Sequence, residues 1–363
     1  MKPKIFALYL PQFYEIKENN EWWGEGYTDW LAVKGSKPLY EGHYQPHIPL
    51  NKYYYNLTNV DTIRWQAKTA KEYGVSGFCI YHYWSKGRQL MERPIDILYE
   101  NSNIDIEYFI SWANHDFKKS WFDGDGHMIW PQEYSEDDIK GHYKYFTKYF
   151  KDPRYLKINN KPVLKIFNIY SIPKFEEMMD SWNTFAKSDG FDGIYLIANK
   201  CNTGMKTAEM LNNKDVDAVF VFEPMNVRSN GSNEELVYTY KRRLKTWLLR
   251  KWNSISRNKI PERFDYQKAN EIMLKRRSCG KQIYCIFPNW DNTPRYGGKG
   301  IVFSGSSPEL FGYYARKFYE RSIAEGNEIL LVNAWNEWGE SAHLEPDEKY
   351  SYSYLEQLKM LVK

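Results

Sequence analysis

The stretch that decides the fold is LVNAWNEWGESAHLEP, residues 331–346, where a buried-strand pattern ends in a cluster of acids and tryptophans. The apolar run Ile329–Val332 leading into it has the composition of a buried β-strand. The run stops at three carboxylates, Glu337, Glu340 and Glu345. So many acids make a poor core, and they predict a functional site at the end of this strand.

Two of these acids are spaced for chemistry on a sugar. Glu337 and Glu340 are three residues apart, so a turn or first helical turn after the strand would point both the same way. Cleavage at an anomeric carbon needs one acid to protonate the leaving oxygen and a second carboxylate to meet the developing positive charge. Trp335 and Trp338 offer flat faces to a sugar ring and exclude water, which favours a protonated carboxyl. The alternative is that both acids begin a helix and are stabilised by its dipole.

Length and composition favour one large domain whose aromatic side chains stack on a ligand. The chain has 363 residues, which a barrel of about 250 residues with long loops accommodates. Aromatic residues make up 18%, with 14 Trp and 31 Tyr, as expected for stacking on sugars or bases. The net charge of +4 is small beside the 50 basic and 46 acidic residues, so no nucleic-acid partner is predicted.

No targeting segment is evident in the sequence. The N-terminal residues are too short an apolar run for a signal peptide, and no run of about 18 apolar residues occurs. We therefore expect a cytoplasmic protein. The four cysteines are widely spaced, and we expect all four to be reduced. No cofactor is predicted.

Eight short apolar runs, bounded by turn-forming residues, alternate with amphipathic helical patterns. The runs are 5–10, 77–83, 108–112, 163–167, 194–198, 218–222, 283–287 and 329–332. The helical patterns are 60–73, 94–101, 137–150, 175–188, 207–213, 234–252, 266–277, 308–324 and 354–362.

This alternation predicts an α/β fold, a (β/α)8 TIM barrel with long aromatic βα loops. A doubly wound open sheet is the main alternative, but it usually has fewer strands, and no glycine-rich phosphate loop follows the first run. We predict a single catalytic domain over residues 1–363, with an insertion at about 224–281 between strands six and seven.

Aromatic and polar residues gather where the strands end, on the face where barrel enzymes place their sites. The predicted catalytic pair is Glu337 and Glu340. The predicted stacking walls are Trp22, Trp23, Trp84, Trp112, Trp290, Trp335 and Trp338. The predicted polar contacts to substrate are Tyr83, Asn114, Glu223, Asp291, Arg295, Asn336 and Glu345. His82 could orient a substrate hydroxyl, and the alternative is a satisfied core histidine.

Two further patterns have competing interpretations. His43 and His47 are four apart, but Pro46 breaks a helix there and no ligand motif follows, so we predict no metal site. A basic amphipathic segment, 241–252, interleaves lysine and arginine with tryptophan and leucine. A solvated helix face is the plain interpretation, and peripheral contact with anionic lipid or a polyanionic glycan is the sharper one.

The loop motifs together resemble the WbsX-like family, often labelled polysaccharide-biosynthesis glycosyltransferases and related to glycoside hydrolase family 99. The matching segments are YLPQF at 9–13, EWWG at 21–24, GHYQP at 42–46, GFC at 77–79, YHYW at 81–84, WAN at 112–114, DPRY at 152–155, WDNTPR at 290–295, NAWNEWGE at 333–340 and LEP at 344–346. They span nearly the whole chain. The resemblance implies a (β/α)8 barrel and a glycan substrate.

The resemblance also implies roles for the two glutamates. Family 99 enzymes resemble retaining endo-α-mannosidases that act without a protein nucleophile. Glu337 would take the proton from the sugar's 2-hydroxyl, which attacks the anomeric carbon to give a 1,2-anhydro sugar. Glu340 would protonate the leaving oxygen and then activate water. Where relatives tend to read WANENW, this chain reads WANHDF at 112–117, which affects the expected substrate more than the reaction.

Three hypotheses follow from the sequence. The first is a retaining glycoside hydrolase acting on a bacterial-type oligosaccharide or polysaccharide. The second is a glycosyltransferase or transglycosylase in surface-polysaccharide assembly, although the chain has no Asp-x-Asp motif and no nucleotide-sugar fold is predicted. The third is a non-catalytic glycan-binding protein on a barrel scaffold. The sequence does not predict the sugar, the linkage or the oligomeric state.

Overall fold

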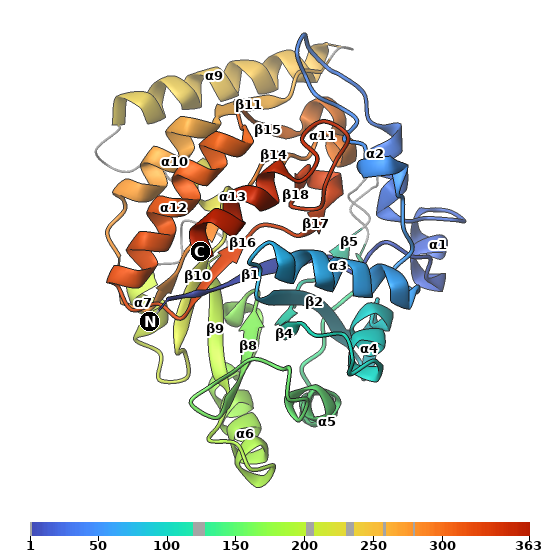
Figure 1. Ribbon diagram of the computed structural model, residues 1–363, viewed down its shortest axis with the longest axis vertical. Helices are drawn as coiled ribbons and strands as arrows, with labels where there is room; N and C mark the ends of the chain where they lie inside the picture. Colours follow the sequence, from blue (N-terminus) through green and yellow to red (C-terminus); the bar gives the residue numbers. More distant parts are fainter. Residues whose placement is uncertain (1, 119–127, 201–206, 230–235, 257–258, 279) are drawn as a thin grey trace.

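A ring of parallel strands lies at the centre of the computed structural model, which describes residues 2–118, 128–200, 207–229, 236–256, 259–278 and 280–363 (Figure 1). The strands are, in chain order, β1 (Lys4–Tyr9), β2 (Gly77–Ser85), β4 (Glu107–Trp112), β8 (Lys161–Ile166), β9 (Tyr195–Lys200), β10 (Ala218–Val221), β12 (Gln282–Ile283), β13 (Cys285–Ile286) and β16 (Ile329–Val332). Each pairs in parallel with its neighbours in the ring.

The ring closes through the seventh predicted strand, which is split in two. β12 pairs with β10, and β13 pairs with β16. Only Tyr284 separates the two pieces, and its carbonyl accepts a 3.0 Å hydrogen bond from the amide of Leu331. The predicted (β/α)8 barrel is therefore confirmed, with a local irregularity in one strand.

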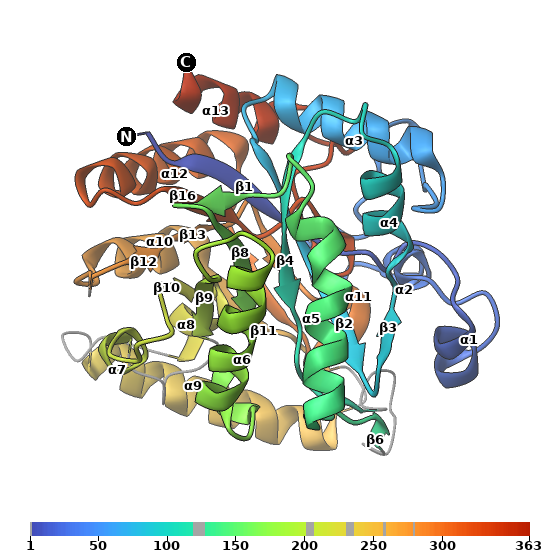
Figure 2. The ribbon, with the colours of Figure 1, turned by 90° about the horizontal axis from the view of Figure 1, so that it is seen from below.

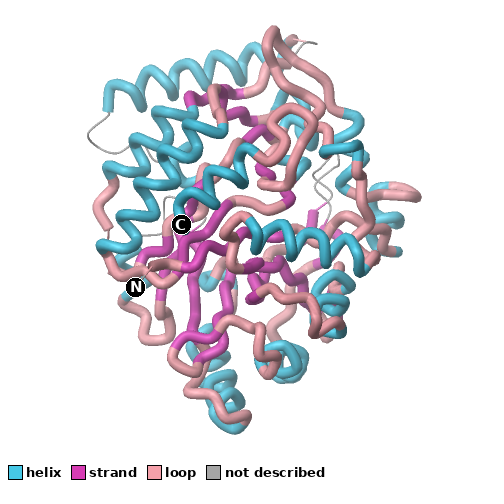
Figure 3. Tube along the Cα trace, in the orientation of Figure 1, coloured by secondary structure: helices cyan, strands magenta, loops and turns pink. Residues whose placement is uncertain are grey.

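Helices cover the outside of the ring (Figures 2 and 3). They are α3 (Val60–Glu72), α4 (Arg93–Glu100), α5 (Glu136–Phe150), α6 (Phe175–Ser188), α7 (Thr207–Leu211), α10 (Tyr266–Lys275), α12 (Pro308–Ala324) and α13 (Ser353–Val362). Several begin at a side-chain cap, as where Ser307 accepts from the amide of Leu310. No helix among the described residues is long and apolar enough to cross a membrane.

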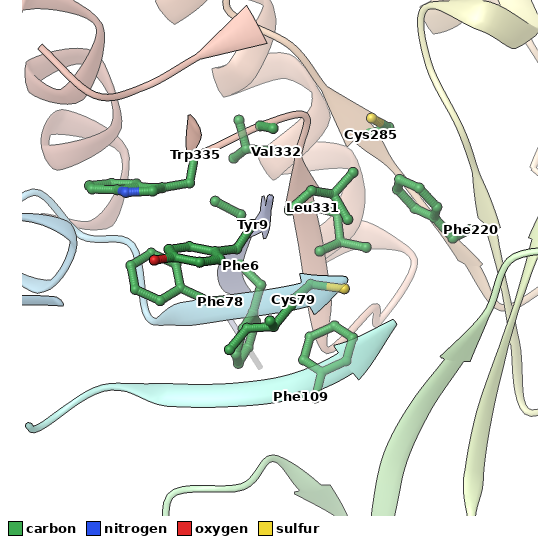
Figure 4. Packing of buried hydrophobic residues seen from close by; sticks show 14 of the residues in the cluster. Phe6, Tyr9, Phe78, Cys79, Phe109, Phe220, Cys285, Leu331, Val332 and Trp335 are labelled. Carbon is green, nitrogen blue, oxygen red and sulfur yellow. The ribbon is translucent and has the colours of Figure 1, made fainter. Parts of the chain in front are cut away.

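The core fills the ring and the space between strands and helices. Phe6 and Phe109 are fully buried near Leu331, and their rings meet edge-on with centroids 5.1 Å apart, whereas Phe78 is almost fully buried beside Tyr9 (Figure 4). Cys79 and Cys285 are buried free thiols, as expected, and Cys201 and Cys279 lie outside the described residues.

Insertions after the strands build the end of the barrel where the site lies. The first loop carries α1 (Lys17–Trp23) and α2 (Asp29–Gly35). The segment between β10 and β12 carries α8 (Met225–Ser229), α9 (Leu236–Ile255), β11 (Glu262–Asp265) and α10. After β13 come β14 (Trp290–Asp291), α11 (Thr293–Tyr296) and β15 (Ile301–Ser304), and β15 joins β11 and β14 in a small sheet. The assignment of 224–281 as an insertion in a single domain stays a prediction.

Candidate active site

A short hairpin after the last barrel strand carries the two candidate catalytic glutamates. Its strands are β17 (Asn336–Glu337) and β18 (Ala342–His343), joined by the single turn η5 (Trp338–Glu340). Glu337 therefore ends a strand, and Glu340 ends the turn that follows it. The acids do not begin an α-helix, because α13 starts only at Ser353, so a helix dipole does not account for them.

Both glutamates contact the same guanidinium group. Nη2 of Arg295 lies 2.9 Å from Oε2 of Glu337, and Nη1 lies 3.1 Å from Oε1 of Glu340. Asp29 completes the group, because its two carboxylate oxygens accept from Nε and Nη2 of Arg295 at 3.1 Å each. The two glutamates thus point into one place, as the spacing of the sequence motif requires.

The backbone of Gly339 lies against this ion group. Its amide donates to Oδ2 of Asp29 at 3.2 Å. A Cβ atom on Gly339 would lie 2.6 Å from both Nε of Arg295 and Oδ2 of Asp29, closer than real Cβ contacts come. Glycine at this position therefore lets the turn between the glutamates pack directly on the Asp29–Arg295 pair.

The electrostatics of the group favour one protonated carboxyl. Burial, and after it the charge of Glu337, raises the pKa of Glu340 to about 8, while Arg295 acts in the opposite direction. Burial also raises the pKa of Glu337, and Arg295 again opposes it. Burial acts to lower the pKa of Arg295, but Asp29 and the two glutamates outweigh it and raise that pKa well above its usual value. One cation faces three acids, so retaining a proton on Glu340 relieves the excess negative charge.

A pocket of about 430 Å³ opens over the two glutamates. Of the predicted site residues it is lined by Tyr83, Trp290, Arg295, Glu337 and Glu340. Sequence reasoning did not select several other lining residues: Leu10, Gln12, Tyr81, Ala113, His115, Phe117, Phe167, Phe222, Met225, Arg228, Asn292, Tyr296, Lys299 and Ile301. The pocket therefore combines aromatic walls with acids and amides, as a sugar site does.

Of the three predicted site residues on β2, Tyr83 lines the pocket, and His82 and Trp84 do not. Tyr81 and Tyr83 line the pocket, and the charge of Glu337 contributes to raising the pKa of each, after burial. Side chains alternate along a strand, so His82 and Trp84 point the other way. Nε2 of His82 lies 2.9 Å from Nε2 of His142, and the ring of Trp84 stacks on His142 with centroids 4.6 Å apart. His82 is a core histidine, and Trp84 is not a stacking wall.

Trp335, Trp338 and Glu345 hold the hairpin and do not line the pocket. Trp335 is fully buried beside Tyr9 and Phe78, with its ring 5.2 Å from that of Phe78 (Figure 4). Trp338 is 1% exposed. Both indole N–H groups donate to Glu345, at 3.0 and 2.6 Å. The predicted stacking and substrate-binding roles are corrected, because both rings are buried and their N–H groups already donate to the two oxygens of Glu345.

Two predicted amides are engaged by the backbone. Oδ1 of Asn336 accepts from the amide of Leu10 at 2.7 Å, and its Nδ2 donates to the carbonyl of Leu10 at 2.9 Å. Asn114 makes the same pair of contacts with the backbone of Asn168, both at 2.8 Å. Each amide therefore joins two segments at the ends of the strands. Neither amide lines the pocket, so the predicted contacts to substrate are not seen.

Two predicted acids are also structural. Glu223 forms an ion pair with Arg276, and its Oε2 accepts from the amide of Val227, in the first turn of α8, at 2.7 Å. Oδ2 of Asp291 lies 2.6 Å from Nε2 of His43, and the Asp291 side chain is 4% exposed. Neither acid lines the pocket, and local backbone and side-chain groups contact their oxygens.

The remaining predicted tryptophans lie outside the pocket lining. Trp112 is buried and meets the ring of His142 edge-on at 4.6 Å. Trp22 is partly buried and meets the ring of Phe117, a pocket residue, at 5.9 Å. Trp23 is also partly buried and contacts another residue of the first loop. Trp22 therefore backs the pocket wall, and Trp112 belongs to the helix-facing core.

One group of buried residues has the atoms for a metal ion. His47, His343 and Asp347 bring ligand-type atoms within 4.8 Å of one another. However, Nδ1 of His343 lies 2.9 Å from the carbonyl oxygen of Glu345, and its Nε2 lies 2.8 Å from Nδ1 of His47. A carbonyl only accepts, so a neutral His343 donates there and accepts from His47. The two rings satisfy each other, and we assign them a hydrogen-bonding role.

Two site residues that the sequence analysis did not select, Tyr81 and Asp29, differ in whether a sequence pattern could have identified them. Tyr81 lies two residues before Tyr83 on a predicted strand, so strict alternation finds it. Asp29 follows Thr28 at the start of a helix, where an acid is expected from capping and dipole effects alone. No sequence signal distinguishes Asp29 from such an acid, and it meets Arg295 only through the folded loops.

The fold and site define a TIM-barrel protein with a pair of pocket glutamates. The comparisons with known proteins give the family: the chain belongs to the family described as Glycosyltransferase WbsX, whose model matches residues 5–358.

Curated relatives include two proteins named Uncharacterized protein WxcX from Xanthomonas campestris pv. campestris. The one from strain B100 is 31% identical over 359 residues, which are 97% of this chain and 48% of the relative. The one from strain ATCC 33913 is 30% identical with the same coverage. The chain therefore spans about half the length of the curated relatives it matches.

Solved structures with this fold include a glycoside hydrolase-like protein, at 14% identity and a TM-score of 0.60, covering 100% of this chain and 94% of the other. They also include the GH99 endo-alpha-mannosidase from Bacteroides thetaiotaomicron, at 13% identity and a TM-score of 0.55, covering 99% and 96%. At these identities the likeness concerns the fold alone.

Proposed function

We propose that this protein is a glycan-active enzyme, specifically a retaining glycoside hydrolase with Glu337 as base and Glu340 as acid and base. The contact of both glutamates with Arg295, at 2.9 and 3.1 Å, carries the proposal. It holds two carboxyls at one pocket, and the raised pKa of Glu340, about 8, supports its role as the acid.

The reaction follows the resemblance to glycoside hydrolase family 99. Glu337 takes the proton of the sugar's 2-hydroxyl as that oxygen bonds to C1. At the same time, Glu340 gives its proton to the leaving oxygen as the bond from C1 to that oxygen breaks. Water then attacks C1 of the resulting 1,2-anhydro sugar and gives a proton to Glu340, and Glu337 returns its proton to the 2-oxygen. Each of the two steps inverts the configuration at C1, so the anomeric configuration is retained overall.

The experiment uses aryl glycosides that differ in their need for an acid, with aryl α-mannosides tested first. Glu340→Gln should lower kcat/KM, which reports the bond-breaking step, about 10²-fold or more on a phenyl glycoside, because phenol is a poor leaving group without a proton. It should lower kcat/KM far less on a 2,4-dinitrophenyl glycoside, which leaves without a proton. Glu348→Gln, an exposed acid near the same loop, is the matched control and should keep the wild-type rate on both. Equal losses on both substrates would remove Glu340 from the acid role.

The family description favours a second candidate, a transferase that moves a sugar to a glycan acceptor with the same two glutamates. Product analysis separates the two candidates. A hydrolase releases free sugar from an activated glycoside even when an acceptor glycan is present. A transferase lengthens the acceptor and releases little sugar. An inactive but glycan-binding chain would leave both products at background.

A further inference from the structure

Helix α9 presents the largest group of exposed apolar side chains on one described element. Leu244, Trp247, Leu248, Trp252 and Ile255 are each between 52% and 79% exposed. Their spacings of three and four place them along one face of the helix. Figures 1 and 2 both show α9 at the outer edge of the molecule.

The opposite face of α9 attaches it to the protein through polar side chains. Oγ1 of Thr246 donates to Glu262 at 2.8 Å. Nδ2 of Asn253 donates to the carbonyl of Ile260 at 2.8 Å, and its Oδ1 accepts from the amide of Ile260 at 2.9 Å. A surface helix normally turns its apolar stripe inward and its polar face outward. In α9 most of the described apolar side chains point outward instead, although Leu249 lines the groove beneath the helix, so the exposed stripe is suited to contact with an apolar phase or partner.

The charge of the helix selects the kind of surface that fits this stripe. The sequence of α9 contains six lysines and arginines and no acid. Among the described side chains, Lys245 and Lys251 are exposed, and Nζ of Lys251 lies 5.0 Å over the ring of Trp247. Tryptophan beside lysine is the combination that binds at the boundary between lipid headgroups and acyl chains. Anionic headgroups add electrostatic attraction to each cation.

We infer that α9 docks this protein on an anionic phospholipid bilayer, with the stripe from Leu244 to Ile255 inserted at the headgroup boundary. Helix α9 lies near the candidate active site, because Arg228 and Lys299 line both the groove under the helix and the glutamate pocket. The inference goes beyond the proposed function and does not depend on it, since bilayer binding is measured without turnover.

The test is co-sedimentation of the full chain with vesicles. Wild-type protein should pellet with vesicles of phosphatidylcholine containing about one third phosphatidylglycerol, and should stay in the supernatant with phosphatidylcholine alone. Replacing both tryptophans, as Trp247→Ser with Trp252→Ser, should lower the vesicle partition coefficient about tenfold or more. Lys245→Glu with Lys251→Glu should lower it too, and high salt should weaken the wild-type binding.

Tyr313→Ser is the matched control, because Tyr313 is a 55% exposed aromatic residue on α12, and it should bind vesicles like wild type. All variants should keep the melting temperature of the wild type, since the changed side chains are exposed. Failure of the wild type to pellet with anionic vesicles, or undiminished binding by the double tryptophan variant, overturns the inference. A dimer in solution that becomes a monomer in the tryptophan variant also overturns it, because a second copy would then cover the stripe.

Discussion

The indole nitrogen of Trp338 donates a 2.6 Å hydrogen bond to Oε2 of Glu345, from the turn that lies between Glu337 and Glu340. The other oxygen of Glu345 accepts from Trp335 at 3.0 Å. Burial raises the pKa of Glu345 to about 7, while these hydrogen bonds act to lower it. A buried acid therefore joins the turn between the two glutamates to Trp335, just before them, and we expect it to affect the reaction by positioning that turn.

Replacing this acid should loosen the hairpin. Glu345→Gln places an amide N–H₂ among the donors of Trp335, Trp338, Tyr55 and Gln66, so at least one buried donor loses its acceptor. We expect a loss of about 1–3 kcal/mol in the free energy of unfolding, measured by urea denaturation. Glu348→Gln is the control and should leave the urea midpoint unchanged. An unchanged midpoint for Glu345→Gln would mean that the four donors find other partners.

The activity should fall at alkaline pH because Glu340 loses its proton. The pKa of Glu340 is raised to about 8, so the carboxyl is protonated below that pH and can serve as the acid. We expect kcat on a phenyl glycoside to decrease tenfold per pH unit above about 8. Glu340→Gln should abolish this alkaline limb in its residual activity. A limb that persists in the variant belongs to another group.

The same raised pKa predicts that the wild type loses stability relative to Glu340→Gln as the pH rises from 6 to 8. A folded-state pKa above the unfolded value means that the contribution of Glu340 is fully present at low pH and is lost as pH rises through about 8. Between pH 6 and pH 8 the wild type should lose about 2 kcal/mol more unfolding free energy than Glu340→Gln. Urea denaturation of both proteins at the two pH values measures this. Parallel pH dependence would show that Glu340 has an ordinary pKa in the folded state.

The sequence was informative where the signal is local. The apolar runs and the Glu337–Glu340 spacing are properties of a few adjacent residues, and the strands and the shared direction of the two acids follow from them. The roles of Trp335 and Trp338 could not be predicted, because a tryptophan beside an acid suits a sugar site and a buried hydrogen bond equally. The choice depends on Glu345, whose position relative to both rings is set by the hairpin.

The contact of Asp29 with Arg295 could not be predicted from the sequence for a related reason. Asp29 and Arg295 are 266 residues apart and meet through two loops whose paths follow from tertiary packing. Strand alternation, in contrast, was available, and applying it to β2 from Tyr83 would have placed Tyr81 in the pocket and His82 outside it.

His115 lines the pocket, in the segment 112–117 where the resemblance implies a different motif, and it should influence sugar preference. It is exposed to the pocket and meets the ring of Phe117 edge-on at 5.3 Å. His115→Glu replaces a ring and a hydrogen-bonding nitrogen with a carboxylate. We expect the ratio of kcat/KM values between two sugars to change about tenfold, mainly through KM, with an unchanged melting temperature. Equal effects on all sugars would assign His115 a general packing role.

Gly339 should not tolerate a methyl group. In Gly339→Ala the new Cβ would lie 2.6 Å from Nε of Arg295 and from Oδ2 of Asp29, so the buried ion pair or the turn must shift. We expect a loss of about 1–3 kcal/mol in unfolding free energy and a fall in kcat, because Glu337 and Glu340 both depend on Arg295. Gly35→Ala, at the end of α2 with nothing near its Cβ position, is the matched control and should be neutral. If Gly339→Ala were as stable and as active as Gly35→Ala, the guanidinium would not fix the two glutamates.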